Sequence, residues 1–367
     1  MKVIIAAAGT AGHINPGIAI ANKIKEENPK AKIIFIGTMR GIENDLVPRA
    51  GYELKTIEAY GIQKRINIQN FKNICKTIKG FSEARKIIEE EKPDLVIGTG
   101  GYICGAVLTA AQKKNIPTML HESNSYPGLA VRLLAKKTDV IMVAFEEAKN
   151  RLKKAKKVVL TGTPTKIKNV KLNNEEIKNR MGIVNNLPVV LAFGGSQGAR
   201  TINNNILQII KEGKNKDYQL IWAPGQKQYD IVKEELEKVN ININNVKNAK
   251  IFPYIYNMQE VMSISDLIIA RSGAMTITEL SIMGKPAIFI PLPSRNANRQ
   301  EDNARVLEKL NAAKVILETE LDSKKLANTI DELIYNKEKL LQMGENARKI
   351  AIENAEDRIY EEIKKIR

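Results

Sequence analysis

Short apolar runs alternate with stretches of helical periodicity along the whole chain, and this alternation constrains the fold more than any other feature. Repeated strand–helix units assemble into parallel sheets with helices on both faces. We therefore expect an α/β fold with doubly wound, Rossmann-like sheets. The expected strands are 3–8, 32–36, 54–58, 95–97, 118–121, 140–143 and 158–160, followed by 189–193, 219–222, 250–252, 267–270, 287–290 and 314–316.

The chain has 367 residues, which is too many for one ordinary hydrophobic core. A turn at Gly162-Thr163-Pro164 separates two groups of expected strands and is the best domain boundary. We expect a first domain at 1–163 and a second at 164–344, with a ligand cleft between them. A helical tail at about 345–367 follows the last expected strand.

Glycine-rich turns follow three of the expected strands, at 9–12, 98–101 and 194–198. A strand, a glycine-rich turn and a helix together aim backbone N–H groups at a phosphate. One such turn is weak evidence. Several in one chain indicate paired α/β domains that grip a phosphorylated ligand.

The first of these turns, Gly9-Thr10-Ala11-Gly12, also resembles a degraded dinucleotide-binding fingerprint. That fingerprint needs an acidic residue at the end of the second strand to hold a ribose. Here the second strand ends at Thr38, and Met39 and Arg40 follow without an acid. Because arginine suits a 2′-phosphate, an NADP-dependent oxidoreductase stays open as an alternative.

The third turn matches the Gly-x-Ser-x-Gly nucleophile elbow of hydrolases, with Ser196 as the serine. In that fold the catalytic histidine follows the serine along the chain. The chain has two histidines, His13 and His121, and both precede Ser196. We therefore interpret the turn as a phosphate cradle in which the Ser196 hydroxyl is a hydrogen-bond donor.

His13 directly follows the first glycine turn, at the carboxyl end of a strand, where open α/β sheets bind their ligands. Histidine is the side chain best suited to act as a general base near neutral pH. His13 is therefore the predicted catalytic residue. His121 ends another strand, and we expect a structural or supporting role for it.

The segment 271–280 repeats the strand–glycine–helix pattern and adds an acidic residue. A helix that starts near Gly273 presents its first N–H groups to a phosphate. Glu279 lies farther along that helix, where its carboxylate can accept hydrogen bonds from both hydroxyls of a ribose. The two features together favour a nucleotide site in the second domain.

Lys and Arg number 58 against 41 Asp and Glu, and the net charge of +17 favours anionic partners. Aromatic residues make up only 5%, too few for base-stacking surfaces, so we expect no nucleic acid partner. The sequence has no Asp-x-Asp and no cluster of His, Cys and carboxylates, so we expect no bound metal. Backbone N–H groups, helix ends and basic side chains must then balance the charge of a diphosphate.

The stretch 64–81 carries apolar residues at helical spacing, bordered by lysines: Phe71, Ile74, Ile78 and Phe81, with Lys72, Lys76 and Lys79. This pattern is typical of helices that lie on an anionic membrane surface. It fits an ordinary amphipathic helix packed on a sheet equally well. No apolar run reaches the length of a membrane span, so we expect a cytoplasmic protein that can sit on a membrane.

Taken together, these features resemble the MurG family, the UDP-N-acetylglucosamine:N-acetylmuramyl-(pentapeptide) pyrophosphoryl-undecaprenol N-acetylglucosaminyltransferases of peptidoglycan synthesis. The segments 9–13, 121–124, 194–198 and 271–279 carry the resemblance, which runs nearly end to end. It implies a GT-B fold and an inverting, metal-independent transfer that needs no cofactor. GlcNAc would pass from UDP-GlcNAc to the muramyl 4-hydroxyl of lipid I and give lipid II.

The resemblance also implies where the enzyme works and with what. It implies peripheral attachment to the cytoplasmic face of the cell membrane, with an anionic surface and other cell-wall synthesis proteins as partners. It implies a final helix that packs back on the first domain. In that domain Thr10, Ala11 and Gly12 would line the donor diphosphate and sugar, His13 would be the general base and Asn124 would contact the GlcNAc.

The same resemblance implies a donor site in the second domain. Ser196 would contact a phosphate, and Ile255 would hold the uracil edge through its backbone. Glu279 would bind the ribose, and Gln300 would bind the sugar hydroxyls. The N–H groups on the α-phosphate would come from Ala274, Met275 and Thr276.

One substrate-binding position departs from the family pattern, because Lys166 stands where the family has an arginine after the linker Gly-x-Pro. Lysine keeps the positive charge but lacks the bidentate fork of arginine. Two alternatives stay open: a UDP-GlcNAc 2-epimerase on the same fold, and the NADP-dependent oxidoreductase. An epimerase would need more ionisable groups around the sugar and no lipid-facing surface.

Overall fold

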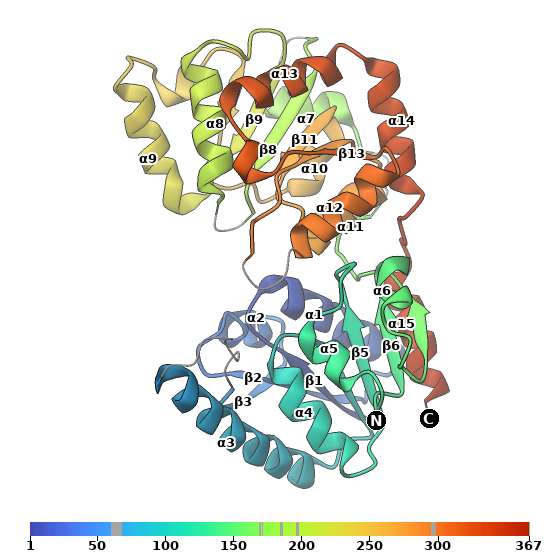
Figure 1. Ribbon diagram of the computed structural model, residues 1–367. Helices are drawn as coiled ribbons and strands as arrows, with labels where there is room; N and C mark the ends of the chain where they lie inside the picture. The colour runs from blue at the N-terminus through green and yellow to red at the C-terminus, as the bar shows by residue number, and fades with distance from the viewer. Residues whose placement is uncertain are drawn as a thin grey trace. The chain divides into compact units, whose positions relative to one another are not determined.

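The chain folds into two compact α/β units, seen in a computed structural model (Figure 1). One unit comprises Met1–Lys166 together with Ile352–Arg367, and the other comprises Ile167–Ala351. The structure describes residues 1–59, 68–168, 170, 172–183, 186–195, 198–294 and 299–366, with the side chains of 68–78 left out.

The first unit is built on a seven-stranded parallel sheet in the order β3-β2-β1-β4-β5-β6-β7. The order reverses direction between β1 and β4. In doubly wound sheets, ligands bind beyond the carboxyl ends of the strands at such a switch point. The strands are β1 (Lys2–Ala7), β2 (Lys32–Thr38), β3 (Glu53–Ile57), β4 (Leu95–Gly100), β5 (Thr118–Glu122), β6 (Val140–Val143) and β7 (Val158–Leu160).

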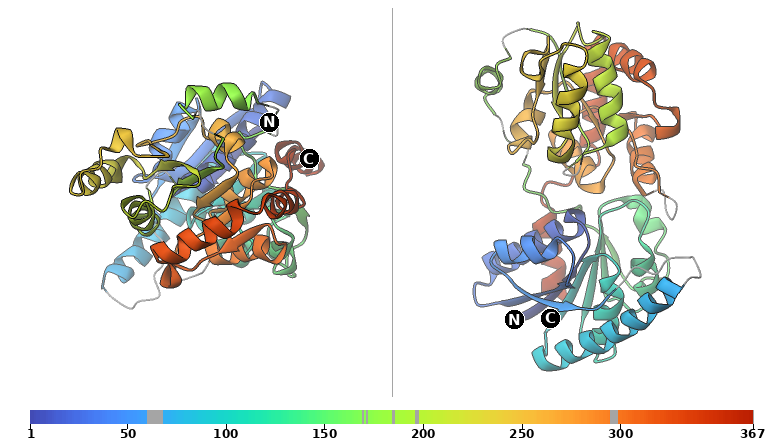
Figure 2. Two further views of the ribbon diagram at one scale, coloured as in Figure 1. Left: turned by 90° about the horizontal axis from the view of Figure 1, so that it is seen from above. Right: turned by 90° about the vertical axis from the view of Figure 1, so that its left-hand side faces the viewer.

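Helices cover both faces of this sheet (Figure 2). Successive residues of β1 belong to different apolar cores: Val3 and Ile5 to one, Ile4 and Ala6 to the other. This is the alternation expected of a strand that is buried on both faces. The first core includes residues of α1 (Ala11–Glu27), α2 (Glu43–Arg49) and α15 (Ala355–Lys365); the second includes residues of α3 (Ile68–Glu91), α4 (Ile103–Gln112), α5 (Leu129–Leu134) and α6 (Glu146–Asn150).

The second unit has a six-stranded parallel sheet in the order β10-β9-β8-β11-β12-β13, so its switch point lies between β8 and β11. Its strands are β8 (Val189–Phe193), β9 (Gln219–Ala223), β10 (Ala249–Ile251), β11 (Leu267–Ala270), β12 (Ala287–Phe289) and β13 (Ala313–Val315). Its α-helices are α7 (Asn174–Arg180), α8 (Arg200–Lys211), α9 (Gln226–Glu237), α10 (Met258–Ile264), α11 (Ala274–Met283), α12 (Arg299–Lys309), α13 (Ser323–Ile334) and α14 (Lys337–Arg348), with 3₁₀ turns at Ile243–Asn245 and Glu318–Glu320.

The helix α15 belongs to the first unit although it follows the whole second unit in sequence. Ile359 and Ile363 are buried in the first apolar core of that unit. Lys23 on α1 lies 2.8 Å from the Asp357 carboxylate, and Lys157 forms an ion pair with the buried Glu362. Apolar burial and charge pairing therefore both fix α15 against the first sheet.

The strands observed are those expected from the sequence, with ends that differ by at most three residues, and both sheets are doubly wound. The predicted α/β architecture is thus confirmed. Within the described ranges, none of the helices combines the length and apolar character that a membrane crossing requires.

Candidate active site

The first glycine turn connects β1 to α1 at the switch point of the first sheet. Gly9 has φ = 95°, a conformation that favours glycine, and Thr10 caps the helix that begins at Ala11. The first N–H groups of a helix have no acceptor within the helix. The predicted residues Thr10, Ala11 and Gly12 therefore place these N–H groups where ligands bind in such sheets.

His13 lies on the first turn of α1, and its ring is held on two sides. The ring Nδ1 is 3.1 Å from the Ala8 carbonyl oxygen and 3.4 Å from the Thr10 hydroxyl. Gly100 has φ = 129°, and a Cβ placed there would lie 2.3 Å from the His13 ring. The turn after β4 thus leaves room for the imidazole, and the Thr99 hydroxyl donates to the His13 carbonyl at 2.8 Å.

Asn124 follows β5, next to β4 in the sheet, and a buried carboxylate orients it. Glu122 Oε1 accepts from the backbone and side-chain nitrogens of Asn124, each at 2.9 Å, and Oε2 accepts from Gly128 N at 2.6 Å. His121 Nε2 contacts the Gly162 carbonyl at 2.9 Å, and burial lowers the pKa of His121. His121 thus links β5 to the segment that follows β7.

A second buried carboxylate, Glu43, lies behind the first glycine turn, and the sequence analysis did not identify it. Glu43, at the start of α2, is fully buried and accepts from Gly9 N at 3.1 Å and from Thr38 N at 2.9 Å. Burial raises the pKa of the Glu43 carboxyl, but these hydrogen bonds outweigh burial and leave the pKa below its ordinary value. Glu43 follows Thr38 by five residues and points inward, toward the glycine turn.

The turn after β8 depends on glycine in the second unit. A Cβ at Gly194 would lie 2.2 Å from Ala199 N, and one at Gly198 would lie 2.2 Å from the Pro224 carbonyl oxygen. The turn closes with a hydrogen bond from Gly198 N to the Gly195 carbonyl at 2.9 Å. Ser196 lies outside the described residues.

The neighbouring strand β11 ends in a second turn that opens onto a helix. Gly273 is the N-cap of α11, so Ala274, Met275 and Thr276 occupy its first turn. Glu279 lies half-buried on the same helix. Since β8 and β11 pair in the sheet, the starts of α8 and α11 follow adjacent strand ends at the switch point. Two helix N-termini there favour a negatively charged group.

Gln300, at the start of α12, is tied to the same turn. The Ser272 hydroxyl donates to the Gln300 carbonyl at 2.7 Å, and the Gln300 side-chain oxygen accepts from Leu292 N at 2.9 Å. Arg271 donates to the carbonyls of Ile290 and Pro291 at 2.9 and 3.1 Å and pairs with Glu318. Arg271 thereby joins the segments after β11, β12 and β13, a role the sequence analysis did not identify.

The remaining predicted residues lie at loops. Ile255 follows β10 and is buried. The residues on either side of it in the sequence, Tyr254 and Tyr256, are exposed, and their ring centroids are 4.9 Å apart. Lys166 is exposed at the end of the first unit. In the part of the chain that the structure describes, no three His, Cys, Asp or Glu side chains are grouped so that they could hold a metal ion.

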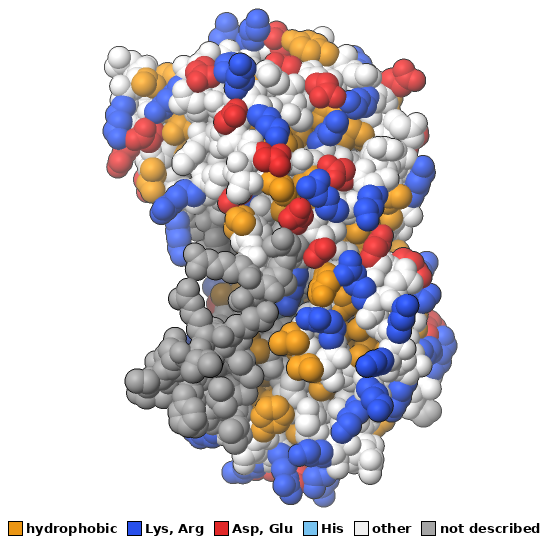
Figure 3. Space-filling model, in the orientation of Figure 1, with side chains coloured by type: hydrophobic (Ala, Val, Ile, Leu, Met, Phe, Trp, Pro, Cys, Tyr) orange, Lys and Arg blue, Asp and Glu red, His pale blue; other side chains and the backbone are white. Residues whose placement is uncertain are grey.

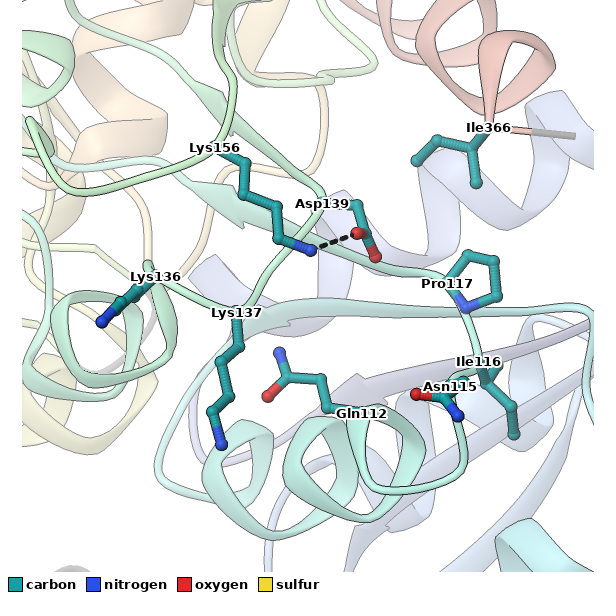
Figure 4. A pocket seen from close by; sticks show the side chains of 9 residues that line it. All are labelled: Gln112, Asn115, Ile116, Pro117, Lys136, Lys137, Asp139, Lys156 and Ile366. Atoms are coloured by element: carbon teal, nitrogen blue, oxygen red, sulfur yellow. Dashed lines mark hydrogen bonds and ion pairs between the residues drawn. The ribbon is translucent and has the colours of Figure 1, made fainter.

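A pocket of about 700 Å³ in the first unit lies away from these residues (Figure 4). It is lined by Pro117 and Asp139, which precede β5 and β6, and by Lys136 and Lys137; Lys156 reaches Asp139 at 2.8 Å. The pocket is thus at the amino ends of the strands. Doubly wound sheets bind ligands at the opposite, carboxyl ends.

Comparison with known proteins identifies the family. The glycosyltransferase family 28 N-terminal domain model matches residues 3–143, and the glycosyltransferase family 28 C-terminal domain model matches residues 189–359. The chain belongs to glycosyltransferase family 28. It is therefore a glycosyltransferase with the GT-B fold, and the oxidoreductase alternative is set aside.

Individual family 28 proteins match over their full length. The chain is 44% identical over 367 residues to the UDP-N-acetylglucosamine--N-acetylmuramyl-(pentapeptide) pyrophosphoryl-undecaprenol N-acetylglucosamine transferase of Acetivibrio thermocellus, covering 100% of this chain and 98% of that one. The crystal structure of MurG from Acinetobacter baumannii matches with a TM-score of 0.78 and 27% identity over 99% of both chains.

The alternative enzyme on the same fold has a weaker match. A UDP-GlcNAc 2-epimerase from Neisseria meningitidis covers 100% of both chains with a TM-score of 0.66, but only 18% of the residues are identical. At that identity the likeness concerns the fold alone. The resemblance to the MurG family drawn from the sequence is thus confirmed at the family level.

Proposed function

We propose that this protein transfers GlcNAc from UDP-GlcNAc to the muramyl 4-hydroxyl of lipid I and so makes lipid II. The observation that carries the proposal is the 44% identity, over the whole chain, to a transferase named for that reaction. The glycine turns and helix starts at both switch points support the proposal, because they would supply the phosphate-binding groups that such substrates need.

The second unit is the proposed donor domain. The first N–H groups of α11, from Ala274 to Thr276, would bind the α-phosphate, and Glu279 on the same helix would accept from the ribose hydroxyls. Gln300 on α12 accepts a hydrogen bond from Ser272 in the turn before α11 and would bind the sugar hydroxyls. Ser196 and the backbone of Ile255 are the remaining proposed contacts, to phosphate and uracil.

The first unit is the proposed acceptor domain, with His13 as the general base. When Nδ1 of His13 donates to the Ala8 carbonyl, Nε2 is left with the lone pair that can take a proton. Thr10, Ala11 and Gly12 would line the diphosphate and sugar, and Asn124, oriented by Glu122, would contact the GlcNAc. Lys166 would add a positive charge near the substrate.

The proposed reaction is a single displacement with inversion. The muramyl 4-hydroxyl oxygen attacks C1 of GlcNAc while the bond from C1 to the diphosphate oxygen breaks. The hydroxyl proton passes to His13 Nε2, and UDP leaves with the bonding electron pair. The N–H groups at the start of α11 would stabilise the charge that develops on the diphosphate.

UDP release from UDP-GlcNAc, measured with and without a soluble lipid I analogue, tests this function. We expect release only with the acceptor, and a loss of about 10²–10⁴-fold in kcat for His13→Ala with little change in UDP-GlcNAc binding. Near-normal turnover of that variant would exclude His13 as the base. Conversion of UDP-GlcNAc to its 2-epimer without acceptor would instead support the epimerase.

We also propose that the first unit docks on the cytoplasmic face of the membrane through a surface over α4 and α5. Leu129 and Leu133 on α5 are 56% and 74% exposed, and Tyr102 before α4 is 42% exposed. Arg132, Lys136 and Lys137 lie on or just after the same helix. Apolar side chains there are interspersed with lysine and arginine (Figure 3).

This surface combines the two forces that bind peripheral proteins. Burial of a leucine side chain contributes about 1.5–3 kcal/mol, and each basic residue near an anionic surface contributes about 1 kcal/mol. Phe81 on α3 is 38% exposed, whereas the side chains of Phe71, Ile74 and Ile78 lie outside the described part. The sequence left a membrane-facing and a packed α3 equally open, and the proposed docking surface therefore centres on α5.

Vesicle sedimentation tests the docking surface. Leu129→Ser with Leu133→Ser should release the protein from anionic vesicles and leave its use of a water-soluble acceptor intact. Leu341→Ser is the matched control, because Leu341 is 70% exposed on α14 of the second unit. Equal release by both variants would contradict docking through α5.

A further inference from the structure

A buried carboxylate joins the ends of β1 and β2. Oε1 of Glu43 accepts from Thr38 N at 2.9 Å and from the Thr38 hydroxyl at 2.6 Å, while Oε2 accepts from Gly9 N at 3.1 Å. The two oxygens therefore act on different segments. Oε1 holds the end of β2, and Oε2 holds the first residue of the glycine turn that leads to His13.

The chain around Glu43 leaves just enough space for this carboxylate. A Cβ at Gly41 would lie 1.9 Å from Glu43 Oε2, and one at Gly37 would lie 2.7 Å from Glu43 Cγ. The Asn44 side chain donates to the carbonyls of Thr38 and Gly41 at 2.8 and 2.9 Å. The segment before α2 is thus closed around the carboxylate.

A charge with no solvent exposure is costly unless it is fully hydrogen-bonded. In dinucleotide-binding sheets, an acid at the end of the second strand binds a ribose. Glu43 points inward instead, and its carboxylate accepts from the Thr38 N–H, the Thr38 hydroxyl and the Gly9 N–H. The Gly9 N–H is consequently engaged, so contacts to substrate fall to the residues after it.

We propose that Glu43 is a positioning residue for the transfer reaction: by holding the Gly9 amide, it sets the geometry of the turn that carries His13. The inference rests on the proposed role of His13. Glu43 itself would touch neither substrate. Its effect would pass through the three residues between Gly9 and His13 and through the Ala8 carbonyl that contacts the His13 ring.

Two substitutions separate the contributions of the two oxygens. In Glu43→Gln, the amide oxygen can keep both Thr38 donors, which places the amide NH₂ opposite the Gly9 N–H, donor against donor. In Thr38→Val, the hydroxyl donor to Oε1 is lost and the Gly9 contact remains. We expect Glu43→Gln to lower kcat by about 10–10²-fold, because small misplacements of catalytic groups are costly.

The controls tell positioning from stability. Thr38→Val should lower Tm but keep kcat, and so should Glu91→Gln, which removes a carboxylate that pairs with Lys2 and Lys32 near the other end of the same sheet. Equal losses of kcat in Glu43→Gln and Thr38→Val would overturn the proposal, because the carboxylate would then be merely structural.

NMR distinguishes this inference from the role of His13. The chain has two histidines, so the His13 ring signals can be assigned by substitution. Glu43→Gln should shift these ring signals, whether or not His13→Ala is inactive. Unshifted ring signals together with a normal kcat would refute the positioning role of Glu43 and leave the proposed role of His13 untouched. In the wild type, the Gly9 amide should exchange slowly with solvent despite the exposure of Gly9, and fast exchange would refute the proposal even if Glu43→Gln does not fold.

Discussion

Gly100→Ala is the substitution that best tests whether the position of the His13 ring matters for the reaction. Gly100 combines a φ of 129° with direct contact to the imidazole, since a Cβ there would lie 2.3 Å from the His13 ring. An alanine therefore acts twice. It strains the backbone, and it pushes the ring away from the end of β4.

The size of both effects follows from the geometry. Carbon atoms in contact lie about 3.5 Å apart, so the ring must move by roughly 1 Å. A misplacement of about 1 Å can cost about 10²-fold in rate, which corresponds to about 2.7 kcal/mol of transition-state stabilisation. The strained backbone costs of order 1–3 kcal/mol in stability.

The assay compares Gly100→Ala with Gly51→Ala. Gly51 has φ = 83° in the same unit, but a Cβ there meets nothing within 4 Å, so it reproduces the strain without the collision. Both variants should melt at lower temperature and bind UDP-GlcNAc normally. Only Gly100→Ala should lose about 10²-fold in kcat. Equal kcat in the two variants would show that the position of the His13 ring does not limit the reaction.

Three further outcomes are expected. Glu279→Ala should weaken UDP-GlcNAc binding by about 1.5–3 kcal/mol, as measured by calorimetry, and the wild type should discriminate against a 2′-deoxy donor. Arg271→Lys should raise the KM for UDP-GlcNAc about 10-fold in steady-state assays, because lysine lacks the planar fork with which Arg271 holds the Ile290 and Pro291 carbonyls and Glu318 together. The hydrogen bond from Lys55 leads the contacts that lower the pKa of Glu91 to about 2. The Glu91 carboxylate therefore takes up a proton at a higher pH in the unfolded chain than in the folded one. The free energy of unfolding should increase as pH is raised from about 2 to about 4.5, and Glu91→Gln should flatten that increase in urea titrations.

The strands and their connections could be predicted because buried parallel strands are short, apolar throughout and punctuated by glycine. Gly9 and Gly194 mark the ends of two such runs, and the structure places both at switch points. Strand ends were less certain. The expected run 95–97 continues to Gly100, because glycine and threonine can extend a ladder without an apolar signal.

The supporting residues of the site could not be predicted, because their roles depend on contacts distant in sequence. Glu43 lies five residues beyond the end of β2, and only the folded turn brings it to Gly9, 34 residues away. Arg271 and Glu318 pair across 47 residues. Glu122 offered one signal in the sequence, because this charged residue directly follows the expected apolar strand 118–121, and the structure buries it at the end of β5.

The return of α15 to the first unit has a consequence for biosynthesis. Residues 352–367 leave the ribosome after the entire second unit, yet Ile359 and Ile363 complete an apolar core of the first. The first unit must therefore remain incomplete, with that core partly exposed to solvent, until α15 has been synthesised. The second unit can complete its own core before that. Order of synthesis and order of completion are thus reversed in this chain.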